Sequence, residues 1–314
     1  MELAIDVTNL SKRYGNDAPY VLDDVSFAIE SGTKIGLIGP NGAGKSTLMK
    51  ILAGVILPTQ GSVFIHGHDI VKEPMAAKRA VRLVQQSTAF DMFLDGMAAL
   101  KIAARFFGAP DPARNPWVSE LLERFSLAEH MHKPTFMLSD GQLRKLQITR
   151  ALQSPSSILI LDEPTVGLDL ASKLQLTGVL NQIVQENGTS LLLSSHILSE
   201  VESLCEDVLL LQDGHIVAHD HTRNLVQSHG ERSVVLTFGT ASDVDIATDA
   251  LARIGVTAIT IAPDQIQFWV GQAINPVDAL AQLSGEGITI SDVIVLPPNL
   301  EQAYAAITTR GGQA

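Results

Sequence analysis

The sequence predicts an α/β fold in which a mixed sheet carries a phosphate-binding loop, followed by a small α+β domain. Residues 39–46 (GPNGAGKS) lie between an apolar run at 34–38 and a helical pattern at 47–52, and a second apolar run at 157–161 ends in two acids. From residue 232 onward, strand-like and helix-like segments follow one another in the order βαββαβ, which predicts the separate α+β domain.

Residues 39–46 fit the spacing G-x-x-x-x-G-K-[ST] at every fixed position, in the required context of strand, loop and helix. Such a loop needs glycines because a β-carbon would hold the backbone away from a phosphate chain and because the loop must adopt positive φ angles. We expect Lys45 to reach the β- and γ-phosphates of ATP and Ser46 to bind Mg²⁺. An ordinary glycine-rich turn is the alternative, which the lysine, the serine and both flanking elements disfavour. The nucleotide-binding residues predicted here are Gly39, Asn41, Gly42, Ala43, Gly44, Lys45, Ser46 and Thr47.

Asp162 and Glu163 end an apolar run that is typical of a strand buried on both faces, and a third such run lies at 190–194. Two acids at a strand end are costly to bury unless a cation lies nearby, and Mg²⁺ supplies one. Because neighbouring strand residues point to opposite sides, we expect Asp162 to bind the metal, directly or through water, and Glu163 to be the general base toward the attacking water. A solvated acidic turn is the alternative, which the phosphate-binding loop earlier in the chain disfavours.

With further motifs, these residues resemble the ATP-binding subunit of an ABC transporter. The further motifs are residues 138–142 (LSDGQ), Gln86 within 84–87 (VQQS), residues 167–169 (GLD) and His196 after two serines. The resemblance covers residues 1–225 and implies a P-loop NTPase of the ABC cassette type, with a mixed sheet core and a helical insert at about 87–137. It also implies ATP and Mg²⁺ as cofactors and a homodimer as the working form.

The resemblance implies roles for single residues outside the phosphate-binding loop. Tyr14 matches the aromatic residue that stacks on adenine, although an isolated aromatic residue more often packs in a core. Gln86 matches the glutamine that binds Mg²⁺ or the attacking water; Gln85 is the alternative, since the pattern places this residue only to within one position. His196 matches the histidine that binds the γ-phosphate and holds the water and Glu163 in register.

The motif LSDGQ precedes apolar residues at helical spacing, so it is expected to lie at a helix N-terminus. The resemblance implies that this motif contacts ATP held by the other subunit, through Ser139 and Gly141 with Gln142 beside them. Catalysis would then need two copies facing head to tail. Asp140 departs from the more common glycine, and we expect its carboxylate to point away from the polyphosphate because like charges repel.

Residues 167–169 carry a further acid that the resemblance places at the nucleotide site, Asp169. Leu170 stands where the family often has proline after Gly-Leu-Asp. This departure is expected to loosen the loop around Asp169 without removing its carboxylate.

Composition agrees with a cytoplasmic enzyme subunit. The formal charge of −12 argues against a nucleic-acid-binding body, which is normally basic, so no nucleic-acid partner is expected. The single cysteine, Cys205, excludes an intramolecular disulfide and is expected to be an inert buried thiol. No apolar stretch reaches the roughly 18 residues that a spanning helix needs, and the N-terminal residues lack a signal-peptide pattern. A place at the inner face of the cell membrane would therefore come through an integral-membrane permease.

The insert is predicted to contain helices at 96–107, which is followed by Gly108, and at 116–125. In the family that the chain resembles, a groove between this insert and the glutamine loop receives a short helix of the permease. Burial in the insert's own core is an equal alternative for the apolar residues near that groove. These residues are Phe90, Met92, Phe93 and Leu94.

The cassette is predicted to end near a hairpin-like turn and strand at 213–217, followed by a polar stretch through residues 223–230. His215, His219 and His221 are interpreted as part of a solvated turn, because a loose cluster without a defined ligand set is rarely a metal site.

Residues 232–314 are predicted to form a ferredoxin-like domain whose role is dimer contact or regulation. The predicted strands are 233–238, 257–261, 265–270 and 288–296, and the predicted helices are 246–254 and 277–283. The tail at 298–307 resembles the closing helix of ATPase subunits of ABC-2 type exporters.

The sequence therefore favours an ATPase subunit that powers a separate permease through ATP-driven closure of a dimer, and the tail alone favours export over import. One alternative is an importer ATPase whose C-terminal domain senses a ligand. Another is an ABC-type ATPase that acts without a membrane; relatives of that kind usually carry two cassettes or long coiled coils, which this chain lacks.

Overall fold

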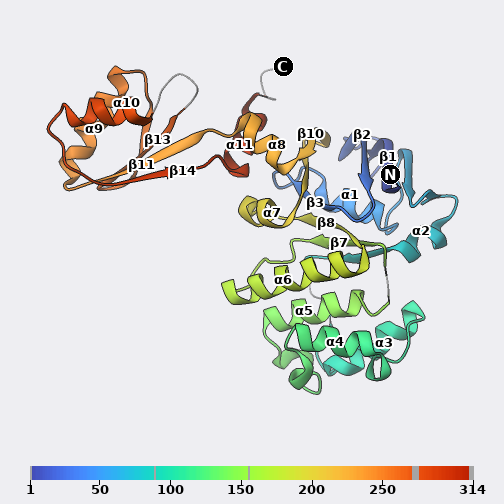
Figure 1. The fold of residues 1–314 in the computed structure, drawn as a ribbon. Coiled ribbons are helices and arrows are strands. Elements are labelled where there is room, and N and C mark those ends of the chain that lie inside the picture. The colour runs from blue at the N-terminus through green and yellow to red at the C-terminus, as the bar shows by residue number, and fades with distance from the viewer. Residues whose placement is uncertain (1, 88–89, 155, 271–275, 311–314) are drawn as a thin grey trace. The chain divides into compact units, whose positions relative to one another are not determined.

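The computed structural model describes residues 2–87, 90–154, 156–270 and 276–310 (Figure 1). The chain forms two compact units, residues 1–221 and residues 222–314. The second unit includes residues 222–225, although the sequence predicts that the cassette extends to about residue 225.

A six-stranded sheet in the order β10-β9-β3-β8-β7-β6 forms the centre of the first unit. Five of its strands are parallel, and β10 is antiparallel at one edge. The strands are β3 (Lys34–Ile38), β6 (Val81–Val84), β7 (Ile158–Asp162), β8 (Ser190–Ser194), β9 (Asp207–Gln212) and β10 (His215–His221). The predicted apolar strands are confirmed, and every residue of β7 and β8 is buried. Because parallel strands end at the same edge, the segments that follow β3, β7 and β8 meet there.

A second, antiparallel sheet has the order β2-β1-β4-β5 and was not predicted from the sequence. Its strands are β1 (Leu3–Lys12), β2 (Leu22–Glu30), β4 (Gln60–Ile65) and β5 (His68–Asp69). One buried apolar cluster joins this sheet, helix α1 (Lys45–Leu52) and the central sheet, with Val7, Leu48 and Ile160 among its members. The phosphate-binding loop is therefore supported from both sheets. Helix α2 (Pro74–Ala80) leads from this sheet into β6.

Helices fill the chain between β6 and β7, as predicted (Figure 1). These elements are α3 (Gly96–Phe107), α4 (Pro116–Arg124) and α5 (Asp140–Ala151), with short 3₁₀ turns at Pro112–Arg114, Ala128–His130 and Thr135–Met137. Asp95 starts α3 by accepting a hydrogen bond from the Ala98 amide at 2.6 Å, and Gly108 ends it in the left-handed conformation. The side chain of Asn115 caps α4 in the same way.

Two further helices follow the strands that carry the acids and the histidine. Helix α6 (Leu170–Asn187) follows β7, and helix α7 (Leu198–Leu204) follows β8. Asp169 caps α6 through the Ser172 amide. Within the described ranges, no helix has the length and apolarity needed to cross a membrane.

The second unit contains the six elements βαββαβ in the predicted order, between two additional helices. They are α8 (Thr222–His229), β11 (Arg232–Phe238), α9 (Ala241–Arg253), β12 (Ala258–Ala262), β13 (Gln265–Val270), α10 (Pro276–Ser284), β14 (Ile290–Leu296) and α11 (Leu300–Arg310). The sheet is antiparallel in the order β12-β13-β11-β14, and α9 and α10 share one apolar core with β11 and β13. The sequence predicts only a polar stretch through residues 223–230, whereas the structure has helix α8 there. Its Leu225 is buried, and α8 packs against α11.

Gly36 in β3 allows α7 to approach the sheet closely. A Cβ at this position would overlap the Val201 side chain on α7, which is fully buried. We expect Gly36→Ala to lower the free energy of unfolding by about 1–3 kcal/mol, because added volume in a packed core causes strain. Urea denaturation of the native protein and of Gly36→Ala measures this loss. Val201→Ala should restore part of the stability in the double variant, whereas purely additive losses would contradict the assigned contact.

Cys205 is buried and forms no disulfide, as predicted, and burial raises the pKa of its thiol to about 12. At pH 8 the thiol is therefore protonated and shielded, so we expect an aromatic disulfide reagent to leave the folded protein unlabelled over minutes. The same reagent should label one thiol per chain in urea. Rapid labelling of the folded protein would show that α7 opens from the sheet.

Candidate functional site

The phosphate-binding loop connects β3 with α1, and the backbone requires two of its glycines. Gly39 has a φ of 155°, and a Cβ there would overlap the carbonyl oxygen of Leu211 in β9. Gly44 precedes α1 with a φ of 106°, and a Cβ there would lie 2.7 Å from the Leu22 side chain and 2.8 Å from the Val21 carbonyl oxygen. The shape of the loop therefore depends on glycine at both positions.

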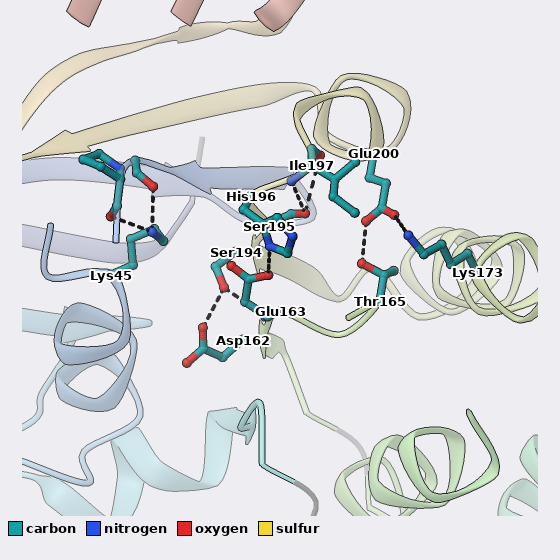
Figure 2. Close-up of polar contacts among 12 residues, drawn as sticks. Lys45, Asp162, Glu163, Thr165, Lys173, Ser194, Ser195, His196, Ile197 and Glu200 are labelled. Atoms are coloured by element: carbon teal, nitrogen blue, oxygen red, sulfur yellow. Dashed lines mark hydrogen bonds and ion pairs between the residues drawn. The ribbon is translucent and has the colours of Figure 1, made fainter. Parts of the chain in front are cut away.

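Lys45 begins α1, and its side chain folds back over the loop (Figure 2). Its Nζ donates to the carbonyl oxygens of Gly39 at 2.7 Å and Pro40 at 3.0 Å, and the residue is only 8% exposed. Burial lowers the pKa of the Lys45 ammonium, while the charges of Glu163 and Asp162 act in the opposite direction. The ammonium thus lies in the loop where a phosphate oxygen could replace the two carbonyl groups.

Asp162 and Glu163 are held by a hydroxyl from the neighbouring strand, that of Ser194 (Figure 2). The Ser194 Oγ donates to Asp162 Oδ1 at 2.7 Å and accepts the Glu163 N–H at 3.0 Å. Glu163 has a φ of 51°, a left-handed conformation that costs about 1–2 kcal/mol for a non-glycine residue. This turn directs the Glu163 carboxylate away from the strand and toward the segment that follows β8. This role of Ser194 was not predicted, although a serine at the end of the apolar run 190–194 is a signal for it in the sequence.

His196 faces Glu163 across the ends of β7 and β8 (Figure 2). The His196 Nδ1 lies 2.5 Å from Glu163 Oε2, with the imidazole side chain 57% exposed and the carboxylate side chain 11% exposed. The two side chains are in hydrogen-bond contact, and the exposed face of the imidazole remains available to a ligand.

One cavity of about 480 Å³ brings together most of the predicted site residues. Its wall contains Gln86 but not Gln85, while the backbone carbonyl oxygens of both residues accept hydrogen bonds from α5. Gly39 and Ala43 shape the loop without lining the cavity. The predicted residues in the wall are Asn41, Gly42, Gly44, Lys45, Ser46, Thr47, Gln86, Asp162, Glu163 and His196.

The motif LSDGQ lies at the N-terminus of α5, as predicted, and none of its residues lines this cavity. The Ser139 Oγ accepts the Gln142 N–H at 3.3 Å, and the Gln142 Oε1 accepts the Ser139 N–H at 3.0 Å. In this capping box, the side chains of Ser139 and Gln142 are both hydrogen-bonded to backbone amides at the start of α5. Asp140 is exposed in the first turn, and Gly141 faces Ser172, to which a Cβ would come within 3.3 Å.

Tyr14 and Asp169 also lie outside the cavity wall. The exposed Tyr14 places its hydroxyl 3.3 Å from the Thr47 Oγ1, which does line the cavity, so the ring is at its edge rather than in a core. Asp169 accepts hydrogen bonds from the Ser172 N–H and Oγ, both at 2.9 Å. These bonds lower the pKa of the Asp169 carboxyl.

Arg144 positions two of these segments and was not identified from the sequence. It is almost fully buried, and its guanidinium donates to the carbonyl oxygens of Gln85 at 2.7 Å and Gln86 at 2.6 Å. Burial lowers the pKa of the Arg144 guanidinium, and the charge of Asp162 opposes this shift. Arginine at helical spacing after LSDGQ normally indicates a solvated face, so the sequence offered no distinguishing signal.

Comparison with known proteins agrees with this geometry. A family model described as ABC transporter matches residues 22–166. The chain is 30% identical to the doxorubicin resistance ATP-binding protein DrrA of Mycobacterium tuberculosis (strain ATCC 25618 / H37Rv), over 98% of this chain and 94% of the relative. It is 27% identical to the linearmycin resistance ATP-binding protein LnrL of Bacillus subtilis (strain 168), over 98% of both chains. It is 31% identical to the Nod factor export ATP-binding protein I of Burkholderia pseudomallei (strain K96243), over 98% and 97%.

Solved structures show the same fold. An ATP-binding subunit of an ABC transporter superposes with a TM-score of 0.65 at 28% identity, over 72% of this chain and 92% of that one. A dimeric ATP-binding cassette bound to ADP and Pi superposes with a TM-score of 0.63 at 24% identity, over 69% and 98%, a likeness that concerns the fold alone. The phosphate-binding loop, the acid pair and the motif LSDGQ agree with these relatives. The chain therefore belongs to the ATP-binding proteins of ABC transporters.

Proposed function

We propose that two copies of this chain hydrolyse ATP between them and thereby power a separate integral-membrane permease that exports its substrate. One observation carries this proposal: a single cavity collects the phosphate-binding loop, the acid pair, Gln86 and His196, while LSDGQ of the same chain lies outside it. A nucleotide in the cavity therefore needs a second copy in order to meet LSDGQ.

In the proposed site, the loop amides and Lys45 bind the phosphates of ATP, and Tyr14 stacks on the base from the edge of the cavity. The exchange of the Gly39 and Pro40 carbonyl groups for phosphate oxygens keeps the Lys45 ammonium paired throughout. Thr47, which contacts the Tyr14 hydroxyl, joins the two parts of this binding surface.

Mg²⁺ suits the oxygen donors in the cavity wall, namely the Ser46 hydroxyl, the Asp162 carboxylate and the Gln86 amide. When bound, the ion neutralises charge on the phosphates. The Ser194 hydroxyl orients Asp162 for this task, and the hydrogen bonds from Arg144 hold the backbone of Gln86.

Glu163 is the proposed general base, because its carboxylate is nearly buried, lies in the cavity wall and is held at a strand end by Ser194. His196 orients this carboxylate through the 2.5 Å contact and presents its exposed face to the γ-phosphate. Glu163 takes a proton from the attacking water, and the His196 imidazole keeps the base directed at that water.

LSDGQ would serve the nucleotide of the second copy. Ser139, Gly141 and Gln142 lie at the positive end of the α5 helix dipole, where amides favour an anion. The exposed Asp140 side chain is free to turn outward, so that the backbone does the binding. Asp169, close to this motif through Ser172, is proposed to contact the same interface.

The permease would dock on apolar residues of the helical insert. Phe93 is 84% exposed and Met92 is 58% exposed, whereas Phe90 is partly covered by Arg150, whose guanidinium lies 4.7 Å from the ring centre. The exposed Phe136 and Met137 belong to the segment that hydrogen-bonds to this loop through Thr135. Several exposed large apolar side chains on two hydrogen-bonded segments are typical of a protein interface. Docking here would hold the chain at the cytoplasmic face of the cell membrane.

Export is supported by relatives whose names concern drug resistance and Nod factor export, and which align with nearly all of this chain, including its C-terminal unit. We propose that this unit, with its ferredoxin-like order of elements, serves dimer contact or regulation. A cavity of about 1010 Å³ beside α8, α11 and Trp269 favours a second possibility, a ligand-sensing role. A compound that inhibits the ATPase of the native chain but not of Trp269→Ala would support sensing.

Replacement of the proposed base should separate binding from turnover. Glu163→Gln should keep ATP affinity and lose at least about a hundredfold in kcat, since general-base catalysis contributes that much. The variant should also form an ATP-dependent dimer, measured by size-exclusion chromatography with light scattering. Glu129→Gln, an exposed acid remote from the cavity, is the control. Ordinary hydrolysis by Glu163→Gln would remove the general-base assignment.

Mixed dimers test whether sites are shared between copies. Lys45→Ala and Ser139→Ala should each be nearly inactive alone. An equal mixture should recover about a quarter of the native ATPase rate, because half of random dimers are mixed and each has one of two sites intact. No recovery would mean either that each chain forms a whole site or that both sites must act together.

A further inference from the structure

Glu200, in the first turn of α7, divides its carboxylate between two partners (Figure 2). Its Oε2 accepts the Thr165 hydroxyl at 2.5 Å, and its Oε1 lies 2.9 Å from the Lys173 Nζ. The Glu200 side chain is 20% exposed and Thr165 is buried, so water screens these contacts less than it screens a surface ion pair. Neither contact reaches the nucleotide cavity.

Both partners belong to the segment that follows the acid pair. Thr165 lies in the turn after Glu163, whose carbonyl oxygen accepts the Val166 N–H, and Lys173 lies in the first turn of α6. The loop that contains Asp169 runs between these two partners. One carboxylate therefore holds this loop, residues 165–173, at both ends.

On its other side, Glu200 is connected to His196 through the backbone: the two neighbours of His196, Ser195 and Ile197, are hydrogen-bonded to each other, and Ile197 is hydrogen-bonded to Glu200. The Ile197 N–H donates to the Ser195 Oγ at 3.0 Å, and the Glu200 N–H donates to the Ile197 carbonyl oxygen at 3.1 Å (Figure 2). A displacement of His196 would therefore move the start of α7 and, with it, the Glu200 carboxylate.

The far side of loop 165–173 meets the motif that lies outside the cavity. Ser172 in this segment approaches Gly141, and the Leu168 side chain also lies near the Cβ direction of Gly141. Loop 165–173 thus lies between the histidine of one site and the helix end that, in the proposed function, faces the nucleotide of the second copy.

We infer that Glu200 is a positioning residue that ties His196 to loop 165–173 and so makes the interface with the second copy respond to the nucleotide in its own cavity. This inference rests on the proposed shared site. Contact of His196 with a γ-phosphate fixes the start of α7, Glu200 then fixes both ends of the loop, and Asp169 and Gly141 are held in the arrangement that closes the dimer. The carboxylate suits this task because it accepts from a hydroxyl and pairs with an ammonium at the same time.

The test compares Glu200→Ala and Thr165→Val with the native protein, all in the full-length chain. We expect Glu200→Ala and Thr165→Val to lower kcat about tenfold while the Kd for ATP changes by less than about twofold, because neither side chain lines the cavity. The double variant Glu200→Ala/Thr165→Val should have a kcat no lower than that of Glu200→Ala, since both substitutions remove the same hydrogen bond. In a Glu163→Gln background, Glu200→Ala should raise the ATP concentration for half-maximal dimerisation about tenfold, or ~1.4 kcal/mol.

Glu186→Gln is the matched control, because Glu186 pairs with Arg124 at the far end of α6 and should leave kcat and dimerisation unchanged. Thermal unfolding accompanies each variant. If Glu200→Ala does not fold, Lys173→Met and Glu200→Gln replace it, since each removes the ion pair but keeps an acceptor for Thr165. Unchanged kcat and dimerisation in folded variants would overturn the inference. Losses of kcat that add up in the double variant and parallel the losses of thermal stability would overturn it as well. Failure of Glu163→Gln alone to dimerise with ATP would instead overturn the proposed shared site.

Discussion

The hydroxyl of Ser194 is the contact on which the catalytic arrangement depends. It donates to Asp162 and accepts the N–H of Glu163, so a single group orients the proposed metal-binding acid and the proposed base. The left-handed backbone of Glu163 is sustained by these bonds, because the Ser194 carbonyl oxygen also accepts the Glu163 N–H. Parallel pairing of β7 with β8 supplies the geometry by placing Asp162 beside Ser194, directly before the segment that carries His196.

Two further side chains extend this arrangement beyond the cavity. Arg144 joins the backbone of the glutamine loop to α5, which begins with LSDGQ, and Glu200 joins the start of α7 to the loop that contains Asp169. Arg144 thus connects a segment that lines the cavity with one that does not, and Glu200 connects two segments that each adjoin a residue of the cavity wall, His196 and Val166. Such pairs of segments are the physical means by which one nucleotide site can influence another.

Local patterns in the sequence predicted the elements that carry the chemistry. The phosphate-binding loop, β7 and β8 were predicted because a fixed motif or a continuous apolar run marks each of them, and α3 and α4 because a helical pattern marks them, which for α3 is stopped at Gly108. The antiparallel sheet was not predicted, since β1 pairs with β2 and β4 across long stretches of sequence. Helix α8 was taken for a polar stretch because only its packing against α11 reveals its apolar side. The alternatives Gln85 and Gln86 also needed the fold, because the sequence pattern does not show which of the two lines the cavity.

The exposed carboxylate of Asp140 affects how two copies can approach each other. It places a negative charge at the helix end that the proposed function brings toward a polyphosphate, on a chain whose formal charge, Asp140 included, is −12. Like charges on two such chains repel over distances comparable with the Debye length, which is about 8 Å at physiological ionic strength. Dissolved salt screens this repulsion, so the ionic strength of the medium helps to set how readily two copies associate around ATP in the proposed function.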